Sequence, residues 1–152
     1  MKVISNKPYI IAEIGNNHEG NFNNATRLIE AAKKSGANAA KFQTFIPELY
    51  HTQLDEDRME ALKRFQLSFK QFEELALYSH ELGLDFISTP FDFESLFFLS
   101  SIADAIKISS GDSVWIDFVE EASKLNAPLI ISTGATTNSE IQNSLKVAYK
   151  HK

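Results

Sequence analysis

The chain has 152 residues, 43% of them apolar and none of them cysteine, and a formal net charge of −5. This length and apolar content suit one compact domain or one piece of a domain. The acidic balance and the lack of a basic stripe argue against a nucleic-acid surface, and the absence of cysteine excludes disulfides, a thiolate nucleophile and a cysteine-based zinc site. No window approaches the roughly twenty apolar residues of a membrane span and no signal peptide is recognisable, so we expect a soluble, cytoplasmic protein without a membrane partner.

Five short apolar runs alternate with longer stretches of helical character. In chain order, the runs are 9–14, 37–42, 85–88, 105–109 and 128–132. Each run is short enough for a strand, and each is followed by a stretch long enough for a helix. The alternation predicts βα units and a parallel sheet, which is an α/β fold.

Two of the intervening stretches show helical periodicity directly. Residues 24–35 are predicted to form a helix that ends at Gly36, and a later helix is predicted over 113–126. Only the connection 44–67 is long, and its Pro47 and charged residues predict an excursion over the surface rather than a linker between domains.

Two further helices are predicted from their first turns. Ser68 with Gln71, and Thr137 with Glu140, have the three-residue spacing of a capping box. The helix that Ser68 begins is expected to run towards Gly83.

Polar residues gather where each predicted strand ends. In α/β proteins ligands bind at this edge of the sheet, so we expect the polar groups of the five strands to meet in one region. They are Glu13 on the first strand, Lys41 and Gln43 on the second, Ser88 and Thr89 on the third, Lys107, Ser109 and Ser110 on the fourth, and Ser132 and Thr133 on the fifth.

Lys41 and Lys107 both stand inside runs that are predicted to be buried. An unpaired buried ammonium group is costly, so each lysine needs an anion. One interpretation is that they pair with Glu13 or Asp112 inside the protein. Two lysines beside several hydroxyls instead favour an anionic ligand, and a ligand with a phosphate and a carboxylate, such as phosphoenolpyruvate, would satisfy both.

Five blocks of sequence resemble one enzyme family, the sialic acid synthases. The blocks are Ile-Ala-Glu-Ile-Gly-Asn-Asn-His at 11–18 with Gly20, Lys-Phe-Gln at 41–43, Ser-Thr-Pro-Phe-Asp at 88–92, Lys-Ile-Ser-Ser-Gly-Asp at 107–112 and Ser-Thr-Gly at 132–134. The family includes N-acetylneuraminate, legionaminate and pseudaminate synthases. The resemblance implies a (β/α)8 TIM barrel, of which residues 1–152 cover about the first five βα units and form the N-terminal part of one domain.

The resemblance also implies an activity and the roles of individual residues. The family joins phosphoenolpyruvate to an N-acetylated hexose, such as N-acetylmannosamine, to give a nonulosonic acid and phosphate. Glu13 would act at the sugar aldehyde and near a metal, and Gln43 would lie near the sugar. Asp112 is a second candidate for a catalytic carboxylate, although it could equally cap the turn after Gly111. Phosphoenolpyruvate would bind to Lys41, Thr89, Lys107, Ser110 and Ser132.

Further implications concern the metal and the assembly. The resemblance implies a divalent cofactor, Mn²⁺ or Mg²⁺, whose histidine ligands would lie beyond residue 152, together with an antifreeze-like C-terminal domain. It also implies a homodimer for the full-length enzyme. We therefore expect no turnover from residues 1–152 alone, and we expect the first and fifth strands of such a piece to be open edges that pair with other chains.

Two other functions remain open from the sequence. Lys107 or Lys41 could form a Schiff base in a class I aldolase, or the chain could be a non-catalytic barrel piece that only binds an anion or a partner. His18 is expected to be structural, and the Phe-rich stretch 91–98 is expected to pack. Glu19 and Ala135 stand where the family usually has Asn and Met, so the shape of the sugar pocket is not fixed by the resemblance.

Overall fold

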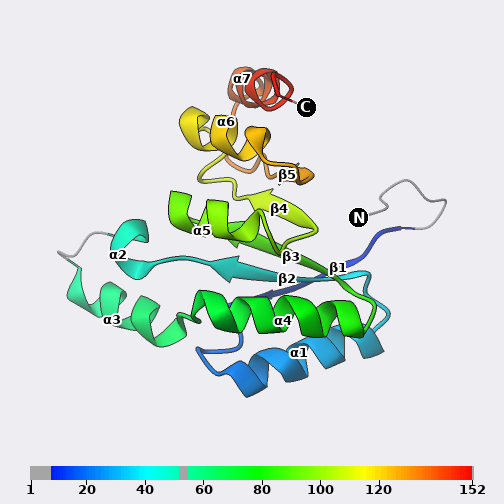
Figure 1. Ribbon diagram of the computed structural model, residues 1–152. Helices are drawn as coiled ribbons and strands as arrows, with labels where there is room; N and C mark the ends of the chain where they lie inside the picture. Colours follow the sequence, from blue (N-terminus) through cyan, green and yellow to red (C-terminus); the bar gives the residue numbers. More distant parts are fainter. Residues whose placement is uncertain (1–7, 52–54, 152) are drawn as a thin grey trace.

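A computed structural model describes residues 8–51 and 55–151. Its five strands form one parallel sheet in the order β1-β2-β3-β4-β5 (Figure 1). The strands are β1 (Ile11–Gly15), β2 (Ala39–Thr44), β3 (Asp85–Pro90), β4 (Ala105–Ile108) and β5 (Leu129–Ile131). All five predicted strands are confirmed, with ends that differ by one or two residues from the prediction. A sheet in which each strand lies beside the next along the chain is the arrangement of a (β/α) barrel.

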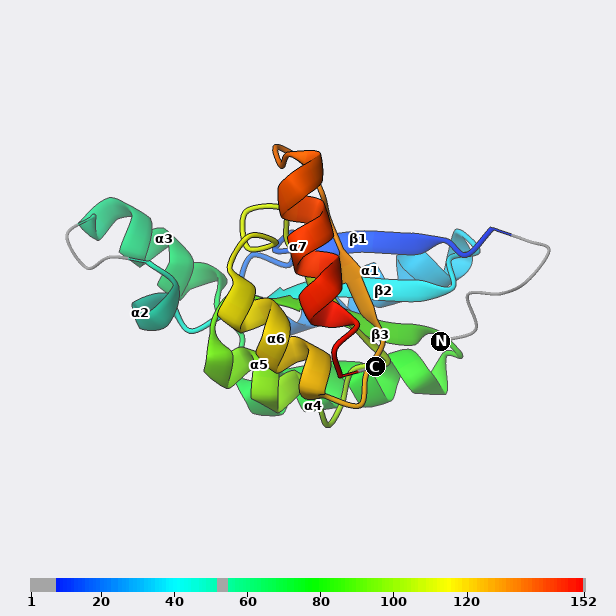
Figure 2. The same cartoon turned by 90° about the horizontal axis from the view of Figure 1, so that it is seen from above.

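A helix follows every strand. The helices are α1 (Phe22–Lys34), α2 (Pro47–Tyr50), α3 (Glu56–Phe65), α4 (Phe69–Glu81), α5 (Phe93–Leu99), α6 (Ile116–Lys124) and α7 (Asn138–Ala148). The predicted helices correspond to α1, α4, α6 and α7, and both capping boxes are formed, at Ser68 with Gln71 and at Thr137 with Glu140. The long connection is a surface excursion as predicted, but α2 and α3 fold within it and project from the body of the protein (Figure 2). Residues 52–54 of that connection lie outside the described residues.

The two faces of the sheet are packed differently. Phe42 and Phe86 face the helices, where they pack with Ile29 and Leu75 in the largest apolar cluster. The next residues along the strands face the other way, because side chains alternate along a strand. There Ala39, Ile87 and Ala105 are buried with Ile11 and Ile130 in a cluster made only of strand residues and Tyr9. In a barrel this second face is the interior, so it is the one that leads to the site.

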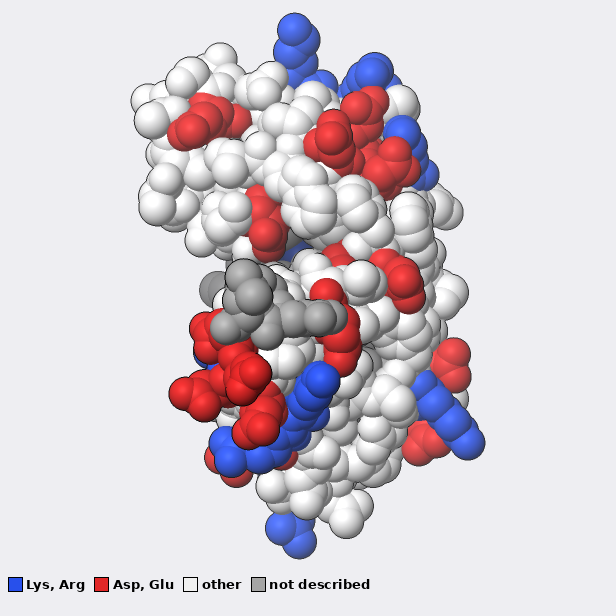
Figure 3. All heavy atoms as spheres, turned by 90° about the vertical axis from the view of Figure 1, so that its left-hand side faces the viewer, with Lys and Arg blue, Asp and Glu red and all other residues white. Residues whose placement is uncertain are grey.

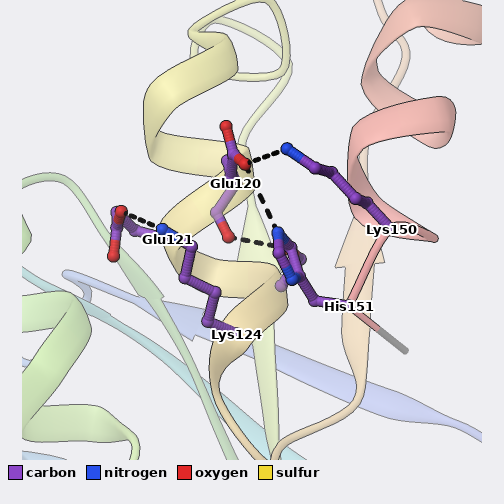
Figure 4. A network of polar contacts seen from close by, with 6 residues as sticks. Glu120, Glu121, Lys124, Lys150 and His151 are labelled. Carbon is purple, nitrogen blue, oxygen red and sulfur yellow. Dashed lines mark hydrogen bonds and ion pairs between the residues drawn. The ribbon is translucent and has the colours of Figure 1, made fainter.

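The C-terminal helix is attached to its neighbour by polar contacts. The Glu120 carboxylate of α6 accepts a hydrogen bond from Lys150 Nζ at 2.7 Å and contacts His151 Nε2 at 3.3 Å (Figure 4). Ser144 of α7 donates to the carbonyl of Ser113 at 2.5 Å. These contacts fix the end of α7 against α6. Over the described residues, no helix is both long and apolar enough to cross a membrane.

Candidate functional site

Most of the predicted polar groups lie at the carboxyl ends of the strands, on the inner face of the sheet. Figure 3 faces this side of the protein, where basic atoms are recessed in a hollow beside acidic side chains. Glu13 lies opposite Lys41 in the β1–β2 register, and Gln43 lies opposite Thr89 in the β2–β3 register. Each of these four residues lies two or four positions after an apolar residue of the same strand and therefore on the same face. The apolar residues are Ile11, Ala39 and Ile87. The inner face therefore changes from apolar to polar along each strand, as the sequence predicts.

Ser88 does not join this set, contrary to the expectation that all strand-end polar groups aim at one region. Its hydroxyl is buried on the helix side and hydrogen-bonds the Thr44 hydroxyl at 2.8 Å. Ser88 and Thr89 are adjacent on a strand and must point to opposite faces. Thr89 is the one that faces the site.

Lys41 has its partners within the protein. Its Nζ is 2.9 Å from Glu13 Oε2 and donates a hydrogen bond to Thr89 Oγ1 at 3.1 Å. The side chain of Lys41 is 8% exposed and that of Glu13 is 60% exposed, so the pair joins a buried cation to a carboxylate at the surface of the site. The ion pair between Lys41 and Glu13, one of the two interpretations from the sequence, is thus present.

Lys107 is different, because no carboxylate of the described residues lies within ion-pair distance of it. Its Nζ donates to Ser132 Oγ at 2.5 Å and to the carbonyl of Ile108 at 3.0 Å. Burial and the nearby Lys41 charge lower the pKa of the Lys107 ammonium below its ordinary value, against the weaker opposing effects of Glu13 and Asp112. Because the Lys107 ammonium is partly buried and has no carboxylate partner among the described residues, an anion that binds beside it would stabilise its charge.

Gln43 is held by a residue that the sequence did not single out. Asn16, in the turn after β1, donates from Nδ2 to Gln43 Oε1 at 2.8 Å. The amide nitrogen of Gln43 then faces Gly15, and a Cβ at Gly15 would lie 3.8 Å from Gln43 Nε2 and 3.8 Å from Glu13 Oε1. Gly15, with φ of +55°, therefore leaves open space between the amide and the carboxylate. In the sequence, the Gly-Asn-Asn turn at 15–17 indicates that a polar loop follows β1, but it does not reveal which side chain Asn16 contacts.

Ser110 and Asp112 lie in the turn that follows β4. Ser109 Oγ donates to Asp112 Oδ2 at 2.5 Å, so Asp112 caps this turn, which is the structural role considered for it. Its charge nevertheless acts on Lys107. A Cβ at Gly134, in the loop after β5, would lie 3.5 Å from Ser110 Cβ. The loops after β4 and β5 therefore meet beside Lys107 and Ser132.

Comparison with known proteins agrees with this arrangement. The NeuB family matches residues 28–152. The chain belongs to the NeuB family. An N,N'-diacetyllegionaminic acid synthase of Campylobacter jejuni is 36% identical over 95% of this chain and 48% of its own length. An N-acetylneuraminate-9-phosphate synthase of Drosophila melanogaster is 35% identical over 88% of this chain and 40% of its own length.

A solved NeuB-type structure has the same fold. The N-acetylneuraminic acid synthetase of Leptospira borgpetersenii superposes with a TM-score of 0.89 at 33% identity, over 94% of this chain and 50% of that one. The chain thus spans about half the length of the relatives it matches. The resemblance inferred from the sequence motifs is confirmed, as is the α/β fold with successive parallel strands.

His18 is buried, and its Nε2 has no hydrogen-bond partner among the described residues. It is 1% exposed, its ring lies near Phe42, and Nδ1 accepts a hydrogen bond from the Gly20 amide at 3.1 Å. Burial lowers the pKa of His18, which favours the neutral ring with its proton on Nε2. Only glycine fits at position 20, because a Cβ there would lie 2.0 Å from the Arg64 carbonyl oxygen. The loop after β1 is thereby fixed against the end of α3.

Asp92, the last residue of the 88–92 motif, is also structural. It is 3% exposed and accepts hydrogen bonds from Ser95 N, Ser95 Oγ and the Ile46 amide, at 2.7 to 2.8 Å. It therefore begins α5 and ties it to the segment after β2.

The described residues do not assemble a metal site. Across 8–51 and 55–151, no three His, Cys, Asp or Glu residues lie close enough together to hold a metal ion. Glu13 is an exposed carboxylate of the site, and one carboxylate paired with a lysine does not make a metal centre. These residues do not fit a metal by themselves.

Proposed function

We propose that the full-length protein condenses phosphoenolpyruvate with an N-acetylated hexose, N-acetylmannosamine or a relative, to give a sialic-acid-like nonulosonic acid and phosphate. The proposal depends on the surroundings of Lys107. This half-buried cation lies beside Lys41, and in the described part of the chain the Lys107 ammonium contacts a hydroxyl and a carbonyl. In a member of the NeuB family this arrangement suits an anionic substrate. The names of the two relatives, which make a legionaminic acid and an N-acetylneuraminate phosphate, support the same class of product.

Phosphoenolpyruvate has two anionic groups, and the site offers two cationic positions. Lys107 with Ser132 would hold one group, and Lys41 with Thr89 would hold the other, with Ser110 between the loops as a further donor. Hydrogen bonds from ammonium groups to anions are about twice as strong as neutral ones. Binding would also offset the repulsion between the two lysines, which lowers the pKa of Lys107 in the free protein.

The reaction would then take place between the bound anion and the carboxylate end of the site. The methylene carbon of phosphoenolpyruvate forms a bond to the aldehyde carbon of the open-chain sugar, and the aldehyde oxygen takes a proton. Water adds to the former enol carbon and loses one proton, then the C–O bond to phosphate breaks and the new hydroxyl loses its proton, which leaves a ketone and free phosphate. Glu13 is placed to orient or deprotonate that water, and the Gln43 amide to donate to a sugar oxygen in the space above Gly15.

Three further features are proposed for the complete protein. A divalent metal, Mn²⁺ or Mg²⁺, would polarise the aldehyde, but no step above passes through it because the described residues do not fit one. A cytoplasmic location is proposed because phosphoenolpyruvate is a charged phosphoester that does not cross a bilayer unaided. A homodimer is proposed from the family membership.

The decisive experiment incubates the full-length protein with phosphoenolpyruvate, a divalent metal and a panel of N-acetylated hexoses, and detects products by mass. A nonulosonic acid formed together with one phosphate per product supports the proposal. Incorporation of pyruvate in place of phosphoenolpyruvate, trapped on lysine by borohydride, would indicate the aldolase instead. Phosphoenolpyruvate binding without any product would indicate a binding module and contradict the proposal.

A further inference from the structure

The Lys107 amine has the geometry of a nucleophile as well as that of a cation. Its Nζ contacts two acceptors, Ser132 Oγ at 2.5 Å and the Ile108 carbonyl at 3.0 Å. A neutral amine has two N–H groups and one lone pair. The two N–H groups match the two acceptors, so the neutral form satisfies its surroundings and keeps its lone pair free.

The surroundings also make loss of a proton from Lys107 easier in the absence of an anion. The described residues place no carboxylate within ion-pair distance of Lys107, whereas Lys41 has Glu13 at 2.9 Å. Burial, and then the Lys41 charge, lower the pKa of the Lys107 ammonium. A lysine that is desolvated and placed next to another cation is the type that attacks carbonyl groups.

We propose that Lys107 is a covalent capture site for anionic carbonyl compounds, in particular phosphorylated aldehydes. Lys41 supplies the positive charge that attracts the phosphate, and Lys107 supplies the lone pair that attacks the aldehyde carbon. The capture inactivates the site, because the proposed condensation uses Lys107 as a cation that holds substrate. A phosphorylated aldehyde is thus an inhibitor whose action is covalent and reversible.

The capture step is an ordinary imine formation. The Nζ lone pair forms a bond to the aldehyde carbon, and the carbonyl oxygen leaves as water with the two amine protons. Hydrolysis reverses the step. Borohydride makes it permanent, since its hydride adds to the imine carbon and the nitrogen takes a proton from water.

The test labels the full-length protein with pyridoxal 5'-phosphate at a low molar ratio, reduces with borohydride and maps the modified peptides by mass. At about pH 8, Lys107 is expected to label several-fold faster than exposed lysines, because burial and the Lys41 charge lower its pKa and leave more of the amine neutral. Lys124, exposed and paired with Glu121 at 2.6 Å, is the reference on the same molecule. This measurement needs no variant, so a folding failure cannot obscure it.

Two variants test the two parts of the inference. Lys107→Arg keeps a cation and removes the nucleophile, so the label on this peptide should disappear while that on Lys124 remains. Lys41→Met removes the second cation, so the preference for pyridoxal phosphate over unphosphorylated pyridoxal should fall several-fold at Lys107. A preference that is unchanged in Lys41→Met would contradict the role given to Lys41.

The inference shares its site with the proposed function, but the two can fail separately. If phosphoenolpyruvate and inorganic phosphate each suppress the labelling of Lys107, the capture site and the proposed function are both supported. If only inorganic phosphate suppresses the labelling of Lys107, the capture site is supported, but phosphoenolpyruvate is not the ligand of this site. Labelling of Lys107 no faster than that of Lys124 overturns the inference, whether or not the protein makes a nonulosonic acid.

Discussion

The region around β2 and the region around β5 repeat the same βα pattern, yet they differ in burial and in pairing. All but one of the six residues of β2 are buried, and Lys41 on β2 has a carboxylate and a hydroxyl as partners. All three residues of β5 are half-buried, and cavities of about 250 and 80 Å³ lie between β5 and α7. Lys107, beside β5, has no carboxylate partner in the described chain. β5 is the last strand of the described sheet and pairs only with β4, so the half-burial of its residues follows from its edge position. The difference that concerns a ligand is the pairing, because Lys41 has a carboxylate partner and Lys107 has none among the described residues.

The largest effect is expected from Glu13→Gln, which acts on the β2 side of this comparison. If Glu13 handles a proton, turnover should fall by about 100-fold or more. Phosphoenolpyruvate affinity should hold or rise, because the change removes a negative charge beside Lys41. Phosphate release measures turnover and calorimetry measures affinity. Glu94→Gln, an exposed carboxylate on α5, is the control, and equal losses of both quantities in Glu13→Gln would indicate a structural role.

Replacing the lysines compares the two regions directly. Lys41→Ala and Lys107→Ala should each weaken phosphoenolpyruvate binding by about 2–5 kcal/mol, the usual effect of removing one partner of a hydrogen-bonded charge pair. Neither should unfold the protein, since Lys41→Ala leaves an exposed Glu13 and Lys107→Ala removes a desolvated cation. Calorimetry and thermal melting measure the two effects, with Lys124→Ala as the surface control. Unchanged affinity in both variants would refute the anion site.

Core substitutions should show the same asymmetry in stability. Leu75→Ala, in the fully buried cluster behind β2, should lower the free energy of unfolding by about 2–5 kcal/mol. Ile131→Ala, on β5 beside both cavities, should cost about half as much, since less of the side chain is buried. Urea unfolding of both variants measures the difference. Equal losses would show that β5 is packed as tightly as β2.

The sequence alone predicts much of this fold. Short apolar runs and two capping boxes are local signals, so all five strands and the starts of α4 and α7 can be located from them. Local signals do not delimit α2, α3 and α5. α2 has only four residues, too few to show a period, and the α3 segment was read as charged surface chain.

The candidate site was predictable as a set of residues and not as a set of contacts. Glu13, Lys41, Thr89, Lys107 and Ser132 come together because they share one face of neighbouring strands. Which lysine takes the carboxylate depends on strand register and on rotamers, and these are set by tertiary packing. For the same reason the contact between Asn16 and Gln43, and the inward turn of Thr89 rather than Ser88, emerge only from the structure.

The smallest effects are expected at two left-handed residues, one in the loop after β1 and one in the loop after β5. Glu19, after β1, has φ of +53°, and Ala135, after β5, has φ of +58°. These are the positions where the chain departs from the usual Asn and Met of the family motifs. A left-handed conformation costs an ordinary L-residue roughly 1–2 kcal/mol, and glycine avoids this cost but loses about 0.5–1 kcal/mol in chain entropy. Substitution by glycine should therefore stabilise each site slightly.

The gain should differ between the two sites, because only one loop is fixed. The neighbour of Glu19, Gly20, packs against the Arg64 carbonyl, so the loop after β1 cannot relax and Glu19→Gly should gain about 1 kcal/mol. The residues 133–135 are exposed, so the loop after β5 can relieve part of the strain and Ala135→Gly should gain less than about 0.5 kcal/mol. Urea unfolding at matched pH measures the free energy of unfolding of both variants. Ala31→Gly, at an exposed position of α1, is a control that should destabilise the protein. A larger gain at Ala135 than at Glu19 would mean that the loop after β5 is the more rigid of the two loops, contrary to this expectation.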